Sequence, residues 1–320
     1  MSLTLSIALC TYNGERFLQK QLDSLLEQTL LPQEIVIRDD HSSDATVELL
    51  QAFAVAAGSR GIVIDLQVNP NNLGYRRNFA NAIEACHGDL VFLCDQDDIW
   101  LADKLERFTK EFEQRPQLLA LHSNAVLIDA EDRELPGSLF TSLKVTRNEL
   151  DRMHDGRGFS TLAGRSIMTG AAMAFRRTLL PDLLPFPTSG WVHDAWIAVI
   201  AAMRGEVDTL EAPAICYRLH ESNQLGVGKA ATGGRRSWRL HLLESERDLA
   251  VHLLAHAQRL GIAESLLIPL HARMRHQQAR LSMPVGLLGR LPLIWQELRN
   301  DGYRQYSRSV RAPLVDLLGL

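Results

Sequence analysis

The sequence lacks an apolar run long enough to cross a membrane. Its longest uninterrupted run, Ala195–Met203, is far shorter than the ~20 residues that span a bilayer. The opening segment MSLTLSIALCTYNG also lacks the basic start and the small-residue cleavage site of a signal peptide, so we interpret it as a first strand. These absences predict a cytoplasmic protein that is either free or peripheral on the inner face of the cell membrane.

Cysteine is scarce and shows no metal-binding spacing. The chain has four cysteines, Cys10, Cys86, Cys94 and Cys216, which form no CxxC pair, and three of them lie in apolar runs. Buried, reduced thiols are the simplest interpretation. They suit a reducing compartment.

Charge is divided unevenly along the 320 residues. Residues 225–320 hold 14 Lys/Arg and 7 Asp/Glu, a net of +7, whereas residues 1–224 hold 20 and 31, a net of −11. We therefore expect one domain over residues 1–225 and a basic, helical region over residues 226–320. The acidic body has no basic–aromatic strand motifs, which argues against nucleic acid as a partner.

Apolar strands and amphipathic helices alternate over the first 130 residues. The pattern predicts strands at 6–10, 34–40, 62–68 and 90–94, and helices at 15–30, 44–57, 75–86 and 100–113. Strands split by helices imply βαβ units and a parallel sheet with right-handed crossovers.

The pattern is looser after residue 130. Residues 131–160 are expected to form turns, Thr169–Arg177 and APAICYRLH strands, and HDAWIAVIAAM a buried helix. The polar segment ESNQLGVGKAATGGRR is the best candidate for a linker. Residues 237–320 have a helical period.

Polar side chains gather where the predicted strands end. CTYNGE, RDDHSSD and CDQDD follow three of the first four strands, and ligands of parallel sheets collect at such carboxyl ends. DQDDIW is a poor calcium loop, but a divalent cation that also touches a phosphate needs only one or two carboxylates. The alternative is a solvated acidic turn in which Asp98 or Asp103 caps the next helix, as we also expect of Ser43 or Asp44 after the second strand.

These segments, in this order, resemble glycosyltransferase family 2. The resemblance covers about residues 4–225 and lies in SIALCTYNGERFLQKQLDSLLEQT, EIVIRDDHSSDAT, NNLGYRRNFANAI, GDLVFLCDQDDIW, TGAAMAFRR and WVHDAWIA. It implies an α/β fold of the GT-A type, a Rossmann-like and mostly parallel sheet flanked by helices, here with a C-terminal helical appendage. YRLHESNQLG and the tail YRQYSRSVRAPLVDLLGL are similar to bacterial rhamnosyltransferase-type members.

The resemblance also implies roles for individual residues. Those assigned to the nucleotide and donor are Thr11, Tyr12, Asn13, Glu15, Asp39, Asp40, Arg77, Asn78 and Asp95. Asp97 and His220 are assigned to Mn²⁺ or Mg²⁺, and Asp194 is the implied catalytic base. Gly170, Trp191 and His193 are assigned to the acceptor side. The family's usual Glu-Asp is His193-Asp194 here, so the base is kept while its neighbour differs.

The implied activity is an inverting, metal-dependent transfer of a sugar from a nucleotide donor to a saccharide. The first choice is L-rhamnose from dTDP-L-rhamnose in cell-surface polysaccharide synthesis of the O-antigen or capsule type, and a UDP-hexose is the second. One alternative is a non-catalytic, nucleotide-sugar-binding partner subunit. A sugar-phosphate nucleotidyltransferase would need a glycine-rich, basic N-terminal loop, and TYNGERF is not one.

The tail from residue 284 mixes Leu, Ile and Trp with arginines. Apolar and cationic faces on short helices suit the surface of an anionic membrane, where a lipid-linked acceptor would lie. The same composition also suits an appendage packed on the catalytic body or a contact in a homo-oligomer. The sequence leaves these alternatives open.

Overall fold

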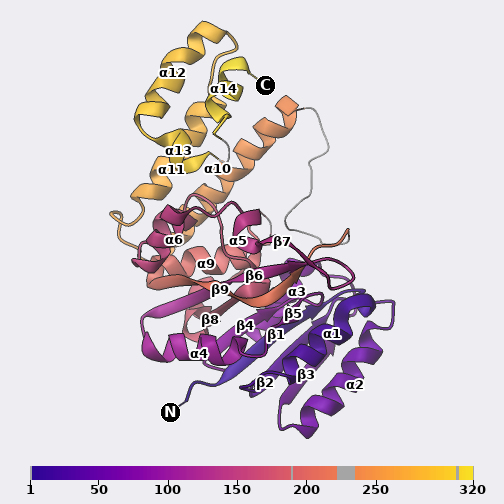
Figure 1. Cartoon of the computed structure of the whole chain (residues 1–320). Coiled ribbons are helices and arrows are strands. Elements are labelled where there is room, and N and C mark those ends of the chain that lie inside the picture. The colour runs from indigo at the N-terminus through magenta and orange to yellow at the C-terminus, as the bar shows by residue number, and fades with distance from the viewer. Residues whose placement is uncertain (1, 189, 222–234, 308–309, 320) are drawn as a thin grey trace. The chain divides into compact units, whose positions relative to one another are not determined.

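The computed structural model describes residues 2–188, 190–221, 235–307 and 310–319 (Figure 1). The chain forms two compact units, residues 1–158 with 166–227, and residues 159–165 with 228–320. The segment 222–234, which holds most of the expected linker, lies outside the described residues.

The first unit contains the sheet. Its strands are β1 (Leu5–Thr11), β2 (Glu34–Asp39), β3 (Val63–Val68), β4 (Leu90–Cys94), β5 (Ile99–Trp100), β6 (Leu118–Ile128), β7 (Glu134–Ser138), β8 (Met173–Arg176) and β9 (Glu206–Arg218). Its helices are α1 (Glu15–Leu26), α2 (Thr46–Ser59), α3 (Tyr75–Glu84), α4 (Lys104–Gln114), α5 (Leu139–Ser142), α6 (Arg147–His154), α8 (Leu180–Leu183) and α9 (His193–Arg204), with 3₁₀ turns η1 (Gly170–Ala172) and η2 (Arg177–Leu179).

Within the described residues, nine strands form one sheet in the order β3-β2-β1-β4-β8-β6-β9-β5, with β7 paired to β6. β1 is parallel to both β2 and β4, β2 is parallel to β3, and β6 is parallel to β9. The short strand β8 is antiparallel to both of its neighbours, β4 and β6. The predicted βαβ pattern is therefore confirmed for β1–β4, and the sheet as a whole is mixed but mostly parallel.

Helices cover both faces of this sheet. α3 and α9 pack on one face, whereas α1, α2 and α4 lie on the other (Figure 1). Every residue of β1 and β4 is buried as a result, which explains their almost continuous apolar sequences. The core between the sheet and helices α1, α2 and α4 includes Leu5, Ile7, Phe92 and Phe108.

Several element boundaries differ from those predicted. The helix expected from residue 100 begins at Lys104, because Ile99 and Trp100 form β5 and pair with Cys216 and Ile215 of β9. The strand expected over 169–177 begins at Met173, since Gly170–Ala172 forms a 3₁₀ turn.

The expectation of turns over residues 131–160 was wrong. This segment holds β7 and three short helices, α5, α6 and α7 (Gly158–Leu162). α5 and α6 each begin with a capping box, Ser138 with Thr141 and Thr146 with Glu149. The Thr-x-x-Glu spacing of the second box was a readable signal for a helix start.

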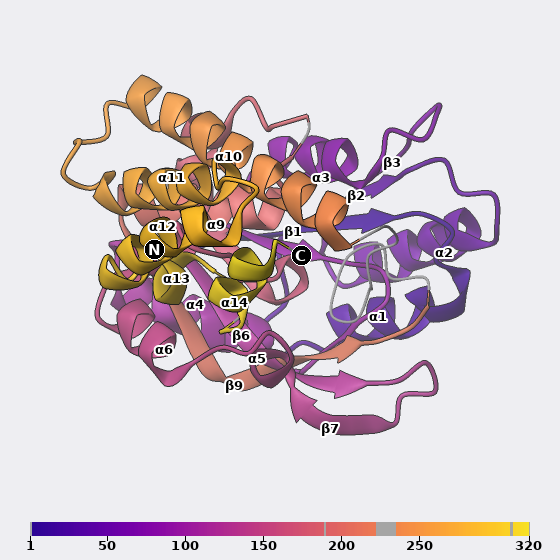
Figure 2. The same cartoon turned by 90° about the horizontal axis from the view of Figure 1, so that it is seen from above.

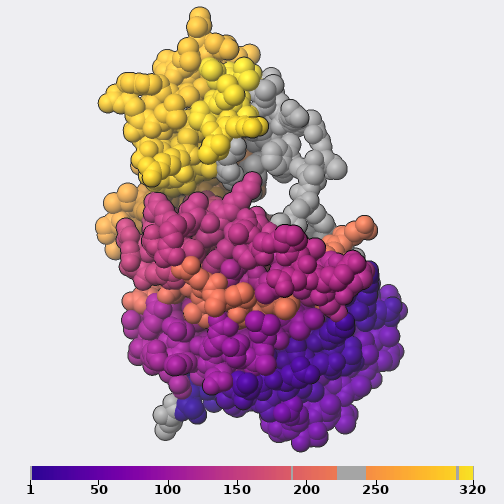
Figure 3. Space-filling view, viewed as in Figure 1, coloured from indigo at the N-terminus to yellow at the C-terminus, as the bar shows by residue number. Residues whose placement is uncertain are grey.

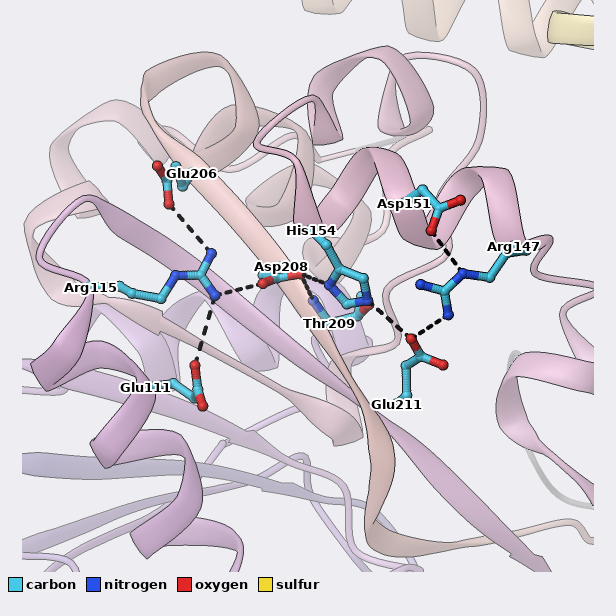
Figure 4. Close-up of polar contacts among 9 residues, drawn as sticks. All are labelled: Glu111, Arg115, Arg147, Asp151, His154, Glu206, Asp208, Thr209 and Glu211. Carbon is cyan, nitrogen blue, oxygen red and sulfur yellow. Dashed lines mark hydrogen bonds and ion pairs between the residues drawn. The ribbon is translucent and has the colours of Figure 1, made fainter.

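A network of alternating charges ties α4 and α6 to the first half of β9 (Figure 4). The Arg115 guanidinium donates to the Asp208 carboxylate at 2.6 Å, and the other Asp208 oxygen lies 2.7 Å from His154 Nδ1. Arg147 donates to Glu211 at 2.6 Å. Each carboxylate here lies beside a basic group, so attraction between opposite charges stabilises the fold at this point.

The second unit is helical. It contains α7, α10 (Arg235–Arg259), α11 (Ile268–Leu281), α12 (Leu287–Arg299), α13 (Gly302–Tyr306) and α14 (Ala312–Leu318). α10 and α11 lie side by side (Figures 1 and 2). Its interior is partly ionic, because Arg280 bonds Asp316 at 2.8 Å and His276 lies 2.5 Å from Glu297.

None of the helices in the described ranges has the length and hydropathy needed to span a bilayer. The four cysteines are all free thiols, and Cys10, Cys86 and Cys94 are buried, as predicted, whereas Cys216 is partly exposed.

Candidate active site

The loop after β1 is fastened to the loop after β2. Thr11 Oγ1 donates to Asp39 Oδ2 at 2.7 Å, and Ser42 Oγ donates to the same oxygen at 2.6 Å. Asn13 has a φ of 46° and accepts a hydrogen bond from the Ser43 amide at 2.8 Å. Asn tolerates this left-handed conformation better than most residues. The TYNG turn is therefore held in one shape before any ligand arrives.

Glu15 and Tyr12 complete this turn. Glu15 Oε2 accepts the Ala45 amide at 2.9 Å, which links α1 to the start of α2. The Tyr12 backbone is held on both sides by Gln96, whose Oε1 accepts from Tyr12 N at 2.7 Å and whose Nε2 donates to Tyr12 O at 3.1 Å. The Tyr12 side chain stays 39% exposed, so its ring is available to a ligand.

Asp40 and Asn78 hold the loop that follows β3. Asp40 accepts hydrogen bonds from the amides of Leu73 and Gly74 at 2.7 and 2.8 Å, and from the Asn69 side chain. Asn78 donates to Arg38 O at 2.8 Å and accepts from Asn69. These contacts give Asp39, Asp40 and Asn78 a positioning role in the loops, and their contact with a nucleotide stays a prediction.

The two arginines of GYRRNF lie in different surroundings. Arg77, the residue predicted for the donor, is exposed, whereas Arg76 is half-buried. The Arg76 guanidinium lies 5.1 Å from the Tyr75 ring, and its positive charge helps to lower the pKa of His193, after the larger effect of burial. Arg76 is therefore the arginine near the start of α9, and sequence reasoning missed it.

The acidic turn after β4 is built around Arg218. Asp98 is buried and accepts the Arg218 amide at 2.9 Å, so it binds β9 and does not cap α4. Asp103 precedes α4 but makes no capping hydrogen bond through its side chain. The Arg218 guanidinium donates to Asp97 O at 2.7 Å and stacks 4.7 Å from the Phe17 ring. The turn is thus a rigid part of the fold, with Asp97 at its half-exposed centre.

The Asp97 carboxylate faces His220. Asp97 Oδ2 lies 2.9 Å from His220 Nε2, and the His220 ring packs 4.7 Å from Phe17. These two side chains were both predicted for the metal, and the fold brings them together from the ends of β4 and β9.

The carboxylates share one electrostatic region. Burial, followed by repulsion from Asp97 and Asp194, raises the pKa of Asp95 from 3.8 to about 8. Burial also raises the pKa of Tyr217, and the charges of Asp98, Asp95, Asp97 and Asp194 raise it further. Asp97 and Asp194 thus act on the same groups although 97 residues separate them in the sequence. Like charges gathered in this way at a sheet edge are typical of a site for a cation.

A buried lysine lies beneath this region. Lys104 is fully buried, donates to Ala171 O at 2.8 Å, and its Nζ lies 3.4 Å from the centre of the Trp100 ring. Burial lowers its pKa to about 7, while the charges of Cys94, Asp98 and Asp95 oppose that shift. Lys104 is therefore a buried amine close enough to Asp95 and Asp98 for their charges to affect its pKa, and no motif indicated it.

Asp194 lies in the first turn of α9, where the helix dipole favours a negative charge. Its Oδ2 accepts the Gly170 amide at 3.0 Å, and its Oδ1 accepts the Ala195 amide at 2.6 Å. A Cβ at Gly170 would lie 3.1 Å from His193 Nε2 and 3.5 Å from Asp194 Cβ. Glycine at 170 therefore allows the backbone to approach and orient this carboxylate.

His193 is 8% exposed and stacks on Phe79 at a centroid distance of 4.0 Å. Burial lowers its pKa, so the ring is neutral at pH 7. Within the described part of the chain, neither ring nitrogen has a hydrogen-bond partner. Trp191 is buried 5.7 Å from the Trp196 ring. Of the predicted acceptor-side residues, Gly170 and His193 thus lie beside Asp194, and the two ring nitrogens of His193 are unpaired in the described chain, whereas Trp191 packs on Trp196.

The donor set fits a hard divalent cation. Asp97 offers a carboxylate oxygen, a ligand that suits Mn²⁺ and Mg²⁺, and the His220 imidazole nitrogen lies 2.9 Å from that oxygen. Among the described residues, no group of three or more His, Cys, Asp or Glu side chains is placed to hold a metal. A cation here would therefore complete its shell with water and phosphate oxygens, as Mg²⁺ sites on phosphates do.

A mostly parallel sheet with an Asp-x-Asp turn at the end of β4 and a carboxylate at the start of α9 is the arrangement of a GT-A glycosyltransferase. Residues 6–184 match the family model for glycosyl transferase family 2. The chain belongs to this family and is a glycosyltransferase.

Two curated relatives illustrate the range of similarity. An uncharacterized glycosyltransferase of Nostoc sp. is 26% identical over 241 residues, which cover 72% of this chain and 69% of the relative. The dTDP-rhamnosyl transferase RfbG of Shigella flexneri is 33% identical over 102 residues, which cover 31% of this chain and 34% of that protein.

Two solved structures share the fold. TarS of S. aureus, residues 1–349 in complex with UDP-GlcNAc, superposes with a TM-score of 0.60 at 19% identity, over 99% of this chain and 90% of that one. The mannosyltransferase PcManGT from Pyrobaculum calidifontis, in complex with GDP-Man and Mn²⁺, superposes with a TM-score of 0.55 at 21% identity, over 99% of this chain and 86% of that one. The predicted GT-A fold followed by C-terminal helices is confirmed.

Proposed function

We propose that this glycosyltransferase is an inverting, metal-dependent enzyme that moves a sugar from a nucleotide donor to a saccharide acceptor. The observation that carries the proposal is the shared electrostatic region of Asp95, Asp97 and Asp194, in which the pKa of Asp95 reaches about 8. Such a concentration of like charge is unfavourable unless a cation is bound there.

Asp97 and His220 would hold the cation, Mn²⁺ or Mg²⁺. When bound, the ion stabilises the negative charge that develops on the departing nucleoside diphosphate. The fastened loops 11–15 and 40–46 supply the fixed surface for the nucleotide, with the exposed Tyr12 ring as one wall. The donor residues named from the sequence are proposed to line this surface directly or, for Asp39, Asp40 and Asn78, to shape it.

Asp194 would take the proton of the attacking acceptor hydroxyl, because a sugar hydroxyl is a weak nucleophile at neutral pH. The amides of Gly170 and Ala195 each occupy one lone pair of its oxygens, which fixes the carboxylate and leaves a further acceptor position on each oxygen. His193, neutral and without a hydrogen-bond partner in the described chain, is proposed to meet an acceptor hydroxyl on the same side.

For the donor we propose dTDP-L-rhamnose, and for the role a cell-surface polysaccharide of the O-antigen or capsule type built on a lipid carrier at the cytoplasmic face of the membrane. The partial similarity to the dTDP-rhamnosyl transferase RfbG supports this choice. A UDP-hexose is the second candidate, supported by the UDP-GlcNAc complex of TarS, which has the same fold.

Incubation of the protein with a panel of nucleotide sugars, with Mn²⁺ or Mg²⁺ and with chelator, tests the proposal. We expect metal-dependent release of dTDP from dTDP-L-rhamnose in the presence of a saccharide acceptor, and inverted anomeric configuration in the product by NMR. Metal-independent turnover contradicts the proposed metal role. Tight donor binding without turnover in any acceptor mixture would assign the chain to a non-catalytic partner subunit.

A further inference from the structure

Helix α12 has its polar and apolar faces reversed relative to a normal helix of a globular unit. Its buried residues are Arg290, Ile294 and Glu297. Its exposed face carries Leu288, Leu291, Trp295 and Leu298, which are 79%, 45%, 60% and 49% exposed. The spacing of three, four and three residues places these four side chains on one stripe. A surface helix normally buries such a stripe.

The orientation of α12 is fixed by its buried polar groups. Glu297 Oε2 lies 2.5 Å from His276 Nδ1 of α11. Arg290 donates to Pro284 O at 2.6 Å and to Leu317 O, at the end of α14, at 3.2 Å. Rotating the helix to bury its leucines would leave these charges without their partners, which is costly. The outward apolar stripe is therefore a stable feature of the second unit.

The segments next to α12 also carry exposed apolar residues. Val285, which precedes α12, and Leu287, its first residue, are exposed, and so are Leu314 and Leu318 of α14, the helix against which α12 packs. Figure 3 shows α12 and α14, in yellow, at the surface of this unit. Exposed apolar side chains gathered on one helix face mark an interaction site.

The charges around the stripe are mostly of one sign. Arg299, Arg304 and Arg311 are exposed, and the Arg299 guanidinium lies 4.5 Å from the centre of the Trp295 ring. Two of the three carboxylates in this part of the chain are buried, Glu297 against the His276 ring and Asp316 in an ion pair with Arg280, and the third, Asp301, is exposed. The outer surface is consequently cationic.

We propose that the outward face of α12, together with Leu314 and Leu318 of α14, docks on an anionic lipid bilayer. Leucines and a tryptophan flanked by arginines are the composition of helices that lie in the membrane interface, and a rim arginine gains free energy near anionic head groups. A second copy of the chain would bring the same cationic rim against itself, which opposes self-association. The surface would place the protein beside an acceptor carried on lipid.

Flotation of the full-length protein tests this inference, with vesicles of phosphatidylcholine alone and of phosphatidylcholine and phosphatidylglycerol in equal amounts. We expect strong binding only to the anionic vesicles. The double variant Leu288→Ser/Trp295→Ser should lower the vesicle partition coefficient about tenfold or more, because it removes two large apolar side chains from the interface. Arg299→Gln and Arg304→Gln should each lower it about fivefold.

Matched controls lie on the first unit. Val55 and Val63 are exposed apolar residues there, and Lys110 is an exposed cation, so Val55→Ser/Val63→Ser and Lys110→Gln should leave vesicle binding unchanged. The substituted α12 residues are exposed, and thermal melting checks that each variant folds. If the double variant does not fold, the arginine variants still decide the question.

Equal binding to both kinds of vesicle overturns the proposal, as does full binding by the double variant. A dimer in analytical ultracentrifugation that the double variant abolishes, without vesicle binding by the wild type, would assign the face to a second copy and also overturn it. The assay contains no donor or acceptor, so its outcome is independent of the proposed transferase chemistry.

Discussion

Two clusters of charged side chains in the first unit are built in opposite ways. In the cluster of Figure 4, acids and bases alternate, and hydrogen bonds from Arg147 and His154 hold the pKa of Glu211 below its ordinary value. In the acidic cluster after β4, burial and the charges of Asp97 and Asp194 raise the pKa of Asp95 to about 8. The first arrangement lowers the energy of the fold, and the second raises it.

This difference indicates which cluster has a function beyond folding. A set of mixed charges needs no further explanation, since each group stabilises its neighbours. A set of like charges destabilises the fold unless a bound ligand compensates it. Such unfavourable arrangements are found mainly at active sites. Substitutions in the acidic cluster should therefore lower activity while raising stability. Substitutions in the alternating cluster should lower stability and leave activity unchanged.

The largest expected effect is the loss of activity caused by Asp194→Asn. An amide cannot take the acceptor's proton, so kcat should fall by about 10²-fold or more while donor binding persists. Steady-state kinetics and calorimetric titration with the donor measure the two quantities. Asp151→Asn, in the alternating cluster, is the matched control and should leave kcat unchanged. Full activity of Asp194→Asn would show that Asp194 is not the base.

Gly170→Ala should have the next largest effect. Its Cβ would lie 3.1 Å from His193 Nε2, and His193 is stacked on Phe79, so the ring and the adjacent Asp194 must shift. We expect kcat to fall about tenfold, as misplacement of a catalytic group by a fraction of an ångström does, with the KM for the donor unchanged. An equal loss in kcat and in donor affinity would point to general unfolding of the site.

Paired substitutions should change stability in opposite directions. Asp95→Asn removes a repelled carboxylate and should raise the free energy of unfolding by about 1 kcal/mol or more at pH 8. Asp208→Asn weakens the contacts of Arg115 and His154 and should lower it by about 1 kcal/mol. Urea denaturation of both variants measures these changes. Destabilisation by Asp95→Asn would contradict the contrast between the clusters.

The gain in stability of Asp95→Asn should also depend on pH. Asp95 has a pKa of about 8 in the fold against an ordinary value of 3.8, so between these values the folded chain binds more protons than the unfolded chain. The free energy of unfolding contributed by this group therefore falls as pH rises through that window. The advantage of the variant should grow from about pH 5 to about pH 8 and then level off.

Much of the fold was predictable because its signals are local. β1 and β4 are almost continuous apolar runs, β2 and β3 contain shorter apolar segments, α1–α3 have a helical period, and the polar segments after the strands marked the edge where the carboxylates meet. β5 could not be predicted, because Ile99 and Trp100 become a strand only by pairing with β9, more than a hundred residues later.

The candidate active site, too, was predictable only in part. The identities of Asp97, Asp194 and His220 as a group followed from motifs, but the hydrogen bonds of Asp39, Asp40 and Asn78 to neighbouring loops depend on loop geometry that no motif records. Lys104 and Arg76 were missed because a lysine in a helix start and an arginine beside another one look like solvated residues in the sequence. Only burial and neighbouring charge distinguish them.

Calorimetric titration of dTDP and UDP into the wild type and Asp97→Ala, with and without Mn²⁺, tests the role of the acidic cluster most directly. If the cluster holds a cation against the donor diphosphate, the wild type binds a nucleoside diphosphate only with Mn²⁺, Asp97→Ala loses that binding, and Asp151→Ala keeps it. Metal-dependent binding of undiminished affinity by Asp97→Ala would contradict the account.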